Sequence, residues 1–253
     1  VVEVLSPGTA ITSKFLIDNE NNFLGSLYIE NNIIGYSIID NSTGEFFCGR
    51  VDSKQIKNII STYQIREVIV PEFQEEIFSN ILSSNLMITT YEDWKADHDN
   101  CYEILLKQFK TKSLKGYGID DNSLLIKTSG ACIYYLENNY FGKTNHITSI
   151  SQKIKKGYMN LDDFTMKNLE VFKSLNNQGH HGTLIDIIDS TSTSMGSRLL
   201  KKHLREPLAN SKKIHSRLEL IQELIDDENL LINIKENLKK ISDIERIIGK
   251  ISN

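Results

Sequence analysis

Three carboxylates are placed where they could bind metal ions. Asp40, Glu72 and Asp93 each stand at the end of a short apolar run of the sequence or just after one. Carboxylates that converge at one edge of a sheet can hold the divalent ions that assist phosphodiester hydrolysis. Asp40 also opens the sequence Asp-Asn-Ser-Thr-Gly, where a short acidic side chain commonly bonds the backbone two residues on. The turn interpretation is favoured, and a metal-dependent nuclease is the alternative.

Three further motifs have simpler explanations than catalysis. Residues 142–144 read Gly-Lys-Thr and match the end of a phosphate-binding loop, but the first glycine of that motif falls on Glu137 and a helical pattern precedes it. Residues 98–101 place His, Asp and Cys along one helix without a fixed pocket. Residues 180–181 are two histidines between glycines, with no carboxylate at ligand spacing. We therefore predict no catalytic, metal or cofactor site in this chain.

The densest basic region is a candidate for contact with nucleic-acid phosphates. Lys201, Lys202 and Arg205 lie close together in the sequence, and residues 212–217 add further basic side chains. Clustered Lys and Arg provide the electrostatic part of DNA binding. Basic residues on consecutive helices are more often the solvated face opposite an apolar stripe. Lys201, Lys202 and Arg205 are thus predicted DNA-backbone contacts, with the solvated face as the favoured alternative.

The composition is that of an ordinary globular protein. The chain has 253 residues, of which 40% are hydrophobic and 25% charged, enough for one or two domains with real cores. Its net charge of −4 splits into −8 (11 basic, 19 acidic) for residues 1–142 and +4 (18 basic, 14 acidic) for residues 143–253. Any contact with nucleic acid is therefore expected mainly from the second half.

The cysteines and the apolar runs point to a reducing compartment away from membranes. Cys48, Cys101 and Cys132 lie far apart without a Cys-x-x-Cys pair, so neither a disulfide framework nor a structural zinc site is predicted. No apolar run approaches the roughly 20 residues that a bilayer span needs, and no secretory signal is visible. The expected location is the cytoplasm.

The first half alternates strand-like and helix-like patterns. Two β-rich runs at 23–30 and 33–40 flank Asn31-Asn32, a two-residue connection typical of a hairpin, and a third run covers 45–51. Ser53 is predicted to cap a helix, and strands at 67–70 and 86–91 alternate with further helices. This order predicts a mixed sheet flanked by helices, and the meander resembles the beginning of an RNase H-like sheet. Helices at 99–109 and 122–137 and a loop at 138–143 follow.

From His146 to Lys153 the chain is expected to be extended, and beyond it everything reads as helical. Asn210 or Ser211 is predicted to cap one helix and Asp226-Asp227 to start the next, whose apolar residues 230, 231, 234 and 238 are expected to face inward. The fold class is therefore α/β followed by all-α. The first residue is Val1 rather than Met and the last apolar stripe has no stop signal, so a fragment of a longer protein is expected.

Three long blocks of the sequence resemble one known family. The strings Y-M-N-L-D-D-F-T-M-K-N-L-E-V-F (158–172), G-T-L-I-D-I-I-D-S-T-S-T-S-M-G-S-R-L-L-K-K-H-L-R-E-P-L (182–208) and L-K-K-I-S-D-I-E-R-I-I-G-K-I (238–251) resemble the core domain of the MutS family of DNA mismatch repair proteins. Upstream, V-L-S-P-G-T (4–9), G-Y-S-I-I-D-N-S-T-G-E-F (35–46) and R-E-V-I-V-P-E (66–72) are similar to its connector domain. The resemblance covers nearly the whole chain.

The resemblance implies two domains and a transmitting role. Residues 1–142 would be an RNase H-like connector domain, and residues 143–253 would be the helical core or lever domain, truncated before the clamp. The mismatch reader would precede Val1, and the ATPase, with its ATP and Mg, would follow Asn253. The fragment would then be no enzyme and hold no cofactor, and would pass conformational change between reader, clamp and ATPase.

The family also implies partners. The parent protein is expected to hold mismatched double-stranded DNA as a homodimer and to recruit MutL, for which the connector offers a surface. Tyr102, Glu103 and Lys107, on one predicted helix of the acidic half, are predicted contacts of that surface. The alternative from another functional class is an RNase H-like, metal-dependent nuclease with a helical accessory domain.

Overall fold

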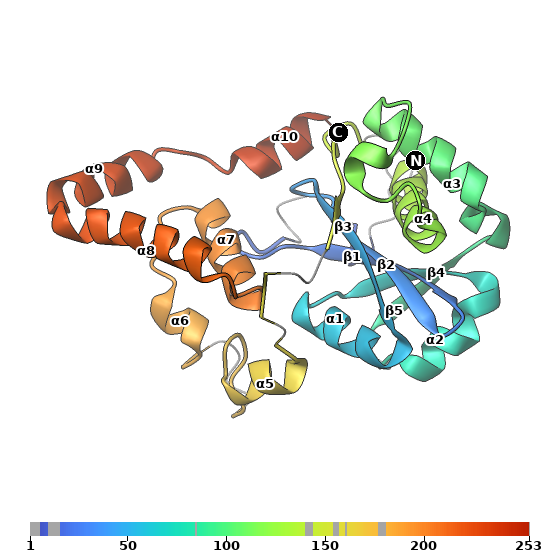
Figure 1. Cartoon of the computed structure of the whole chain (residues 1–253), viewed down its shortest axis with the longest axis horizontal. Coiled ribbons are helices and arrows are strands. Elements are labelled where there is room, and N and C mark those ends of the chain that lie inside the picture. The colour runs from blue at the N-terminus through green and yellow to red at the C-terminus, as the bar shows by residue number, and fades with distance from the viewer. Residues whose placement is uncertain are drawn as a thin grey trace. The chain divides into compact units, whose positions relative to one another are not determined.

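A computed structural model describes residues 6–9, 16–83, 85–139, 144–153, 157–159, 161–176 and 181–252 (Figure 1). The chain divides into two compact units. Unit 1 comprises Val1–Ile17, Asn21–Ile154 and Glu245–Asn253, and unit 2 comprises Asp18–Glu20 and Lys155–Ile244.

A six-stranded mixed sheet forms the centre of unit 1. The first three strands make an antiparallel meander, while the fourth and fifth lie parallel to the first and the sixth lies parallel to the third. In spatial order the strands are β5 (Met87–Tyr91), β4 (Glu67–Pro71), β1 (Phe23–Glu30), β2 (Ile33–Asp40), β3 (Glu45–Asp52) and β6 (Ser151–Gln152).

The β1–β2 hairpin is built by two asparagines. Asn31 and Asn32 have φ values of 50° and 65°, the left-handed conformation that both central residues of a type I′ turn require. Asparagine tolerates this region better than other residues with a side chain. The hairpin predicted from the Asn-Asn pair is confirmed.

Helices cover both faces of the sheet because alternate strand residues point to opposite sides. On β3, Phe46 and Cys48 join one core with α3 and α4, whereas Phe47 and Val51 join a second core with α1 and α2. Figure 1 shows the two helix pairs on opposite faces. The helices of this part of unit 1 are η1 (Ser53–Gln55), α1 (Ile56–Thr62), η2 (Glu72–Gln74), α2 (Glu75–Ile81), η3 (Asp93–Ala96), α3 (His98–Phe109), η4 (Lys115–Tyr117) and α4 (Ser123–Asn139).

Unit 2 is helical wherever the structure describes regular secondary structure. Its helices are α5 (Asp163–Asn168), α6 (Leu184–Ile188), α7 (Ser194–Arg205), α8 (Ser211–Asp226) and α9 (Glu228–Leu238). The predicted fold class, a mixed sheet with flanking helices followed by a helical region, is confirmed. Within the described ranges, no helix is long and apolar enough to cross a membrane.

Side-chain caps start α8 and α9 where the sequence predicts them. The Asn210 carboxamide accepts the Lys213 N–H at 3.1 Å, and the Asp227 carboxylate accepts the Leu230 N–H at 2.9 Å. In unit 1 the predicted Ser53 cap is wrong, because the Ser53 hydroxyl donates to the Asn32 carboxamide at 2.7 Å instead.

The apolar face of α9 is not buried as predicted, and that of α8 is exposed as well. Leu218 is 54% exposed, Ile225 65% and Ile232 48%, and Leu230, Ile234 and Leu238 also reach solvent. The periodicity is helical, but unit 2 offers little to cover it: its buried apolar side chains in the described part are Met166, Val171 and Ile185.

The last helix, α10 (Ile244–Ser252), lies with unit 1 from Glu245 onward. It approaches the β2–β3 turn so closely that a Cβ at Gly249 would lie 2.7 Å from the Ser42 carbonyl oxygen. The Arg246 guanidinium donates to the Ile17 carbonyl at 3.0 Å and is 6% exposed. Unit 1 therefore contains elements from both ends of the described chain.

Candidate functional site

The Asp40 carboxylate anchors the β2–β3 turn. One oxygen accepts the Ser42 N–H at 2.9 Å and the Ser42 hydroxyl at 2.7 Å. The other accepts the Asn21 side-chain amide at 2.9 Å and the Asn22 N–H at 3.2 Å. The Asp40 side chain is fully buried. Four protein donors therefore take the place of water around its carboxylate. The turn interpretation is confirmed.

Glu72 and Asp93 cannot join Asp40 in one metal site, because the sheet separates them. β2 runs antiparallel to β4 and β5, so Asp40 lies at the edge where β1 begins, whereas Glu72 and Asp93 follow the opposite ends of β4 and β5. Asp93 accepts the Phe73 N–H there at 3.1 Å. No group of three or more potential ligands gathers in the part of the chain that the structure describes.

Replacing Asp40 by Asn should destabilise unit 1 by about 2 kcal/mol. The new NH₂ group must face either the Ser42 donors or the asparagine donors, so at least one donor stays unsatisfied. Urea denaturation followed by Trp94 fluorescence measures the change, with the exposed Asp52→Asn as the control. Cleavage of labelled duplex in Mg²⁺ or Mn²⁺ that Asp40→Asn abolished would instead favour the nuclease.

His146 packs beside the same turn. Its Nε2 lies 2.7 Å from the Asn41 carbonyl oxygen, which only accepts, so Nε2 carries the proton. Burial lowers the pKa of His146 below its ordinary value of 6.5, although the Asn41 carbonyl and the Asp40 charge favour the cation. The half-buried imidazole is therefore neutral at neutral pH.

Unit 1 should lose stability as the pH falls below about 6.5. Its unfolded chain takes up a proton at His146 near this pH, whereas the folded unit resists protonation, so protons favour unfolding. His146→Gln keeps an amide donor for the Asn41 carbonyl but cannot titrate. The free energy of unfolding, measured between about pH 7.5 and 5.5, should fall less steeply in this variant. Equal slopes for the two proteins would contradict the assignment.

His98, Asp99 and Cys101 do not form a nucleophilic centre in the structure. The Cys101 thiol is buried and donates to the Lys95 carbonyl at 3.1 Å, and burial raises its pKa to about 12. His98 Nδ1 instead lies 2.9 Å from the exposed Asp99 carboxylate. A protonated, enclosed thiol is not nucleophilic.

The Gly-Lys-Thr motif at 142–144 and the histidine pair at 180–181 lie partly outside the described residues. Gly142, Lys143 and His180 are not described. Thr144 donates its hydroxyl to the Gln108 carboxamide at 2.9 Å, and His181 Nδ1 lies 3.3 Å from an Asp186 carboxylate oxygen at the surface.

The predicted DNA-contacting residues lie on α7, where two of the three are buried. Lys201 is 8% exposed and Arg205 9%, while Lys202 is half-buried. The Lys201 ammonium donates to the Asn19 carbonyl at 2.7 Å, and the Arg205 guanidinium lies 5.2 Å from the centre of the Phe172 ring. Both side chains thus already have contacts within unit 2.

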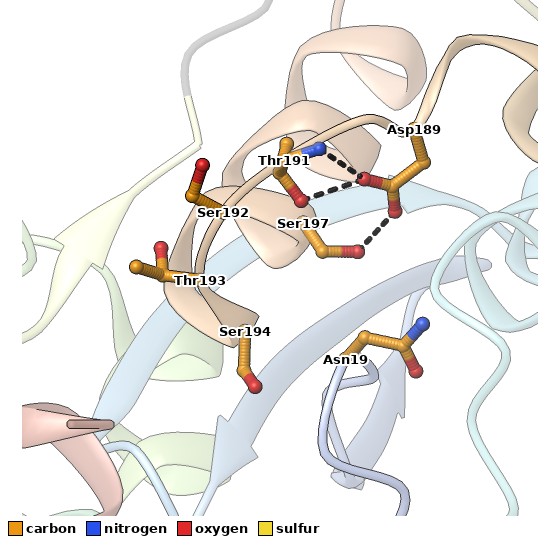
Figure 2. A pocket seen from close by; sticks show the side chains of 7 residues that line it. All are labelled: Asn19, Asp189, Thr191, Ser192, Thr193, Ser194 and Ser197. Carbon is orange, nitrogen blue, oxygen red and sulfur yellow. Dashed lines mark hydrogen bonds between the residues drawn. The ribbon is translucent and has the colours of Figure 1, made fainter. Parts of the chain in front are cut away.

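A polar hollow lies at the start of α7 (Figure 2). One Asp189 oxygen accepts the N–H and hydroxyl of Thr191 at 3.2 Å and 2.6 Å, and the other accepts the Ser197 hydroxyl. The Thr193 hydroxyl accepts the Gly196 N–H at 3.0 Å and caps α7. These contacts join the end of α6 to the start of α7. The lining residues are Asn19, Asp189, Thr191, Ser192, Thr193, Ser194 and Ser197.

The residues predicted to contact MutL share α3 but differ in exposure. Glu103 and Lys107 are exposed, one helical turn apart. Tyr102 is half-buried and donates its hydroxyl to the Asp120 carboxylate at 2.8 Å. Glu103 and Lys107 therefore form the accessible part of this set.

Two buried charged groups, Glu67 and Arg198, were not identified from the sequence. Glu67 begins a strand that the sequence marks only as apolar, yet its carboxylate is fully buried. Arg198 forms a two-bond pair with Asp243, at 2.8 Å and 2.7 Å. The signal for the second was present: Arg198, Lys201 and Arg205 recur at i, i+3 and i+7, the spacing of a buried helix stripe.

Family models match most of the chain. A model of MutS domain II matches residues 22–148, and a model of MutS domain III matches residues 164–253. The DNA mismatch repair protein MutS of Flavobacterium psychrophilum is 37% identical over 252 residues, and that of Salinibacter ruber is 35% identical over 257. Both comparisons cover 100% of this chain but only 29% and 28% of the relatives, so the chain spans less than a third of their length. The chain therefore belongs to the MutS family of DNA mismatch repair proteins and carries domains II and III of that family.

Proposed function

We propose that this chain is the connector and core part of a mismatch repair protein and transmits conformational change between mismatch reader, clamp and ATPase. One observation carries the proposal: α10 belongs to the region matched by MutS domain III, yet it packs in unit 1 against the turn of domain II at Ser42. A helix in contact with a rigid turn moves with that turn, because packed interiors deform little.

The proposal assigns the remaining activities to the parent protein. Mismatched double-stranded DNA, homodimer formation, ATP and Mg are expected to involve parts of the parent outside this segment, in the cytoplasm. The segment itself is proposed to catalyse no reaction. The proposed boundary between connector (1–142) and core (143–253) falls on residues outside the described ranges, so it stays a prediction.

DNA contact by Lys201, Lys202 and Arg205 stays a prediction as well. The burial of Lys201 and Arg205 means that direct phosphate contact by these two requires unit 2 to open locally. Exposed basic residues at 212, 213 and 217 are more accessible. The isolated chain is therefore expected to bind duplex weakly and with strong salt dependence.

A MutL surface on α3 is the second part of the proposal. Glu103 and Lys107 present opposite charges side by side on an exposed helix face, and rim charges of this kind govern association rates and partner choice. Tyr102 lies beside them and is fixed through Asp120, which gives the surface a rigid aromatic element.

The test uses the full-length protein that carries this segment. With wild type, mismatched duplex should accelerate nucleotide exchange and recruit MutL. Glu103→Lys combined with Lys107→Glu should lower MutL recruitment while mismatch-dependent exchange is unchanged. The control is Lys57→Glu on α1, which is exposed on the opposite face of the sheet. A wild type that does not distinguish mismatched from matched duplex would refute the transmitting role.

A further inference from the structure

Three consecutive backbone carbonyls just before β1 accept hydrogen bonds from three buried cations. In unit 1, Arg246 of α10 donates to the Ile17 carbonyl at 3.0 Å. In unit 2, Arg198 of α7 donates to the Asp18 carbonyl at 2.8 Å, and Lys201 donates to the Asn19 carbonyl at 2.7 Å. All three donors belong to the region matched by MutS domain III, whereas their acceptors precede the domain II match.

All three cations are buried, and the carbonyls are among their partners. Their side chains are 4% exposed for Arg198, 8% for Lys201 and 6% for Arg246. A buried charge is tolerated only when hydrogen bonds or an opposite charge compensate for lost hydration. Asp243 compensates Arg198 through two bonds, and backbone oxygens add the charge-assisted bonds that all three cations make.

Lys201 lies among charges of both signs. Burial lowers its pKa, while the nearby Glu20 and Asp189 carboxylates favour the charged form and Arg205 and Arg198 oppose it. Beside these charges, the ammonium donates a hydrogen bond to the Asn19 carbonyl at 2.7 Å. Loss of this carbonyl would leave the buried ammonium without a hydrogen bond that now offsets its lost hydration.

The peptide itself is recognised through its backbone. The side chains of Ile17, Asp18 and Asn19 are exposed, Ile17 to 50%, whereas the carbonyls point to the cations. On the C-terminal side the same stretch is fixed to the sheet, since Asn21 and Asn22 donate to the Asp40 carboxylate. The segment is thus held at every residue from 17 to 19 and again at the start of β1.

We propose that residues 17–19 form a coupling strap: main chain that leads into the connector and is gripped by α7 and α10, so that a pull on the strap reaches both helices directly. This inference rests on the proposed function, which assigns the movement of the strap to the mismatch reader of the parent protein. The route bypasses the sheet, because the bonds to the strap carbonyls come from the core helices themselves.

Hydrogen exchange on the full 253-residue chain tests the strap. Arg246→Gln should raise exchange about tenfold in the peptide covering 16–22 and also in α7, although Arg246 itself lies on α10. Arg198→Gln should have the reciprocal effect on the strap and on α10. Controls are the exposed Lys250→Gln on α10 and Leu199→Ala on α7, which should change neither peptide.

The conservative Arg246→Lys and Arg198→Lys variants keep a cation for the same carbonyls and guard against loss of folding. They should restore most of the protection. The strap would be overturned if the changes in exchange stayed confined to the mutated helix. It would also be overturned if the lysine variants exchanged as fast as the corresponding glutamine variants.

The full-length protein separates this inference from the proposed function. If wild type couples mismatched DNA to nucleotide exchange and Arg246→Gln binds the mismatch but loses this coupling by about tenfold, the strap carries the signal. If wild type couples and Arg246→Gln couples equally well, the strap fails while the proposed function stands. If wild type shows no coupling, the proposed function fails, and the exchange experiment alone decides whether the strap exists.

Discussion

Gly130→Ala is expected to destabilise unit 1 by about 3 kcal/mol, because α3 and α4 touch at this glycine. A Cβ at Gly130 would lie 2.4 Å from Cys101 Cβ, 2.6 Å from Cys101 Cα and 2.9 Å from the Cys101 carbonyl oxygen. Two of these atoms are backbone, so no side-chain rotation relieves the clash and the helices must move apart. The packing of Leu105, Leu125 and their neighbours in the core beneath would loosen with them.

Gly116→Ala is the matched control, since a Cβ at Gly116 meets nothing within 4 Å. The two variants add the same methyl group, so their free energies of unfolding should differ by most of the expected loss of about 3 kcal/mol. This value is near the upper end of the range for overpacking. Urea denaturation followed by far-UV circular dichroism and by Trp94, the single tryptophan of the chain, measures both. Equal midpoints for the two variants would show that α3 and α4 pack less closely than described.

The elements of unit 1 could be predicted because their determinants are local. The Asn31-Asn32 turn needs only two residues with tolerance for positive φ. The Asp40 turn needs only a carboxylate within reach of a backbone N–H two residues on. Alternation along the strands then assigns each side chain to a face. Ser53 fails as a cap for the converse reason: Asn32, distant in sequence, competes for its hydroxyl.

The helical spacing of the buried charges is visible in the sequence, but their partners could not be predicted, because those partners are remote in sequence. The backbone acceptor of Arg198 lies 180 residues earlier, and that of Lys201 lies 182 residues earlier. A helix with Lys and Arg along one stripe is ordinarily assigned to solvent on that side. On α7 the stripe is reversed: Arg198, Lys201 and Arg205 are buried and Leu199 is 52% exposed.

This reversal changes how the basic region is interpreted. Density of Lys and Arg in the sequence measures available charge, whereas phosphate binding needs charge that water and DNA can reach. Lys201 and Arg205 fail that condition in the described unit. The same residues acquire a different role because a backbone carbonyl and an aromatic face satisfy a cation without a phosphate.

Glu67→Ala is expected to destabilise unit 1 by about 3 kcal/mol. The Glu67 carboxylate is fully buried on β4 and receives three donors. One oxygen accepts the Gly8 N–H at 2.8 Å, and the other accepts the Tyr135 hydroxyl at 2.8 Å and the Thr89 hydroxyl at 3.1 Å. Removing it leaves these donors without the acceptor and opens a cavity between α4, β5 and the segment at 6–9.

Glu67→Gln separates hydrogen bonding from charge. Its amide oxygen can accept the Gly8 N–H, and its NH₂ group can donate to the two hydroxyl oxygens, since hydroxyls both donate and accept. The loss in this variant should be about 1 kcal/mol or less. Burial and the Glu67 charge together raise the pKa of Tyr135 to about 12, so the tyrosine still carries its proton at neutral pH in either variant. If Glu67→Gln lost as much stability as Glu67→Ala, the negative charge itself would be required, and the hydrogen-bond account of this site would be wrong.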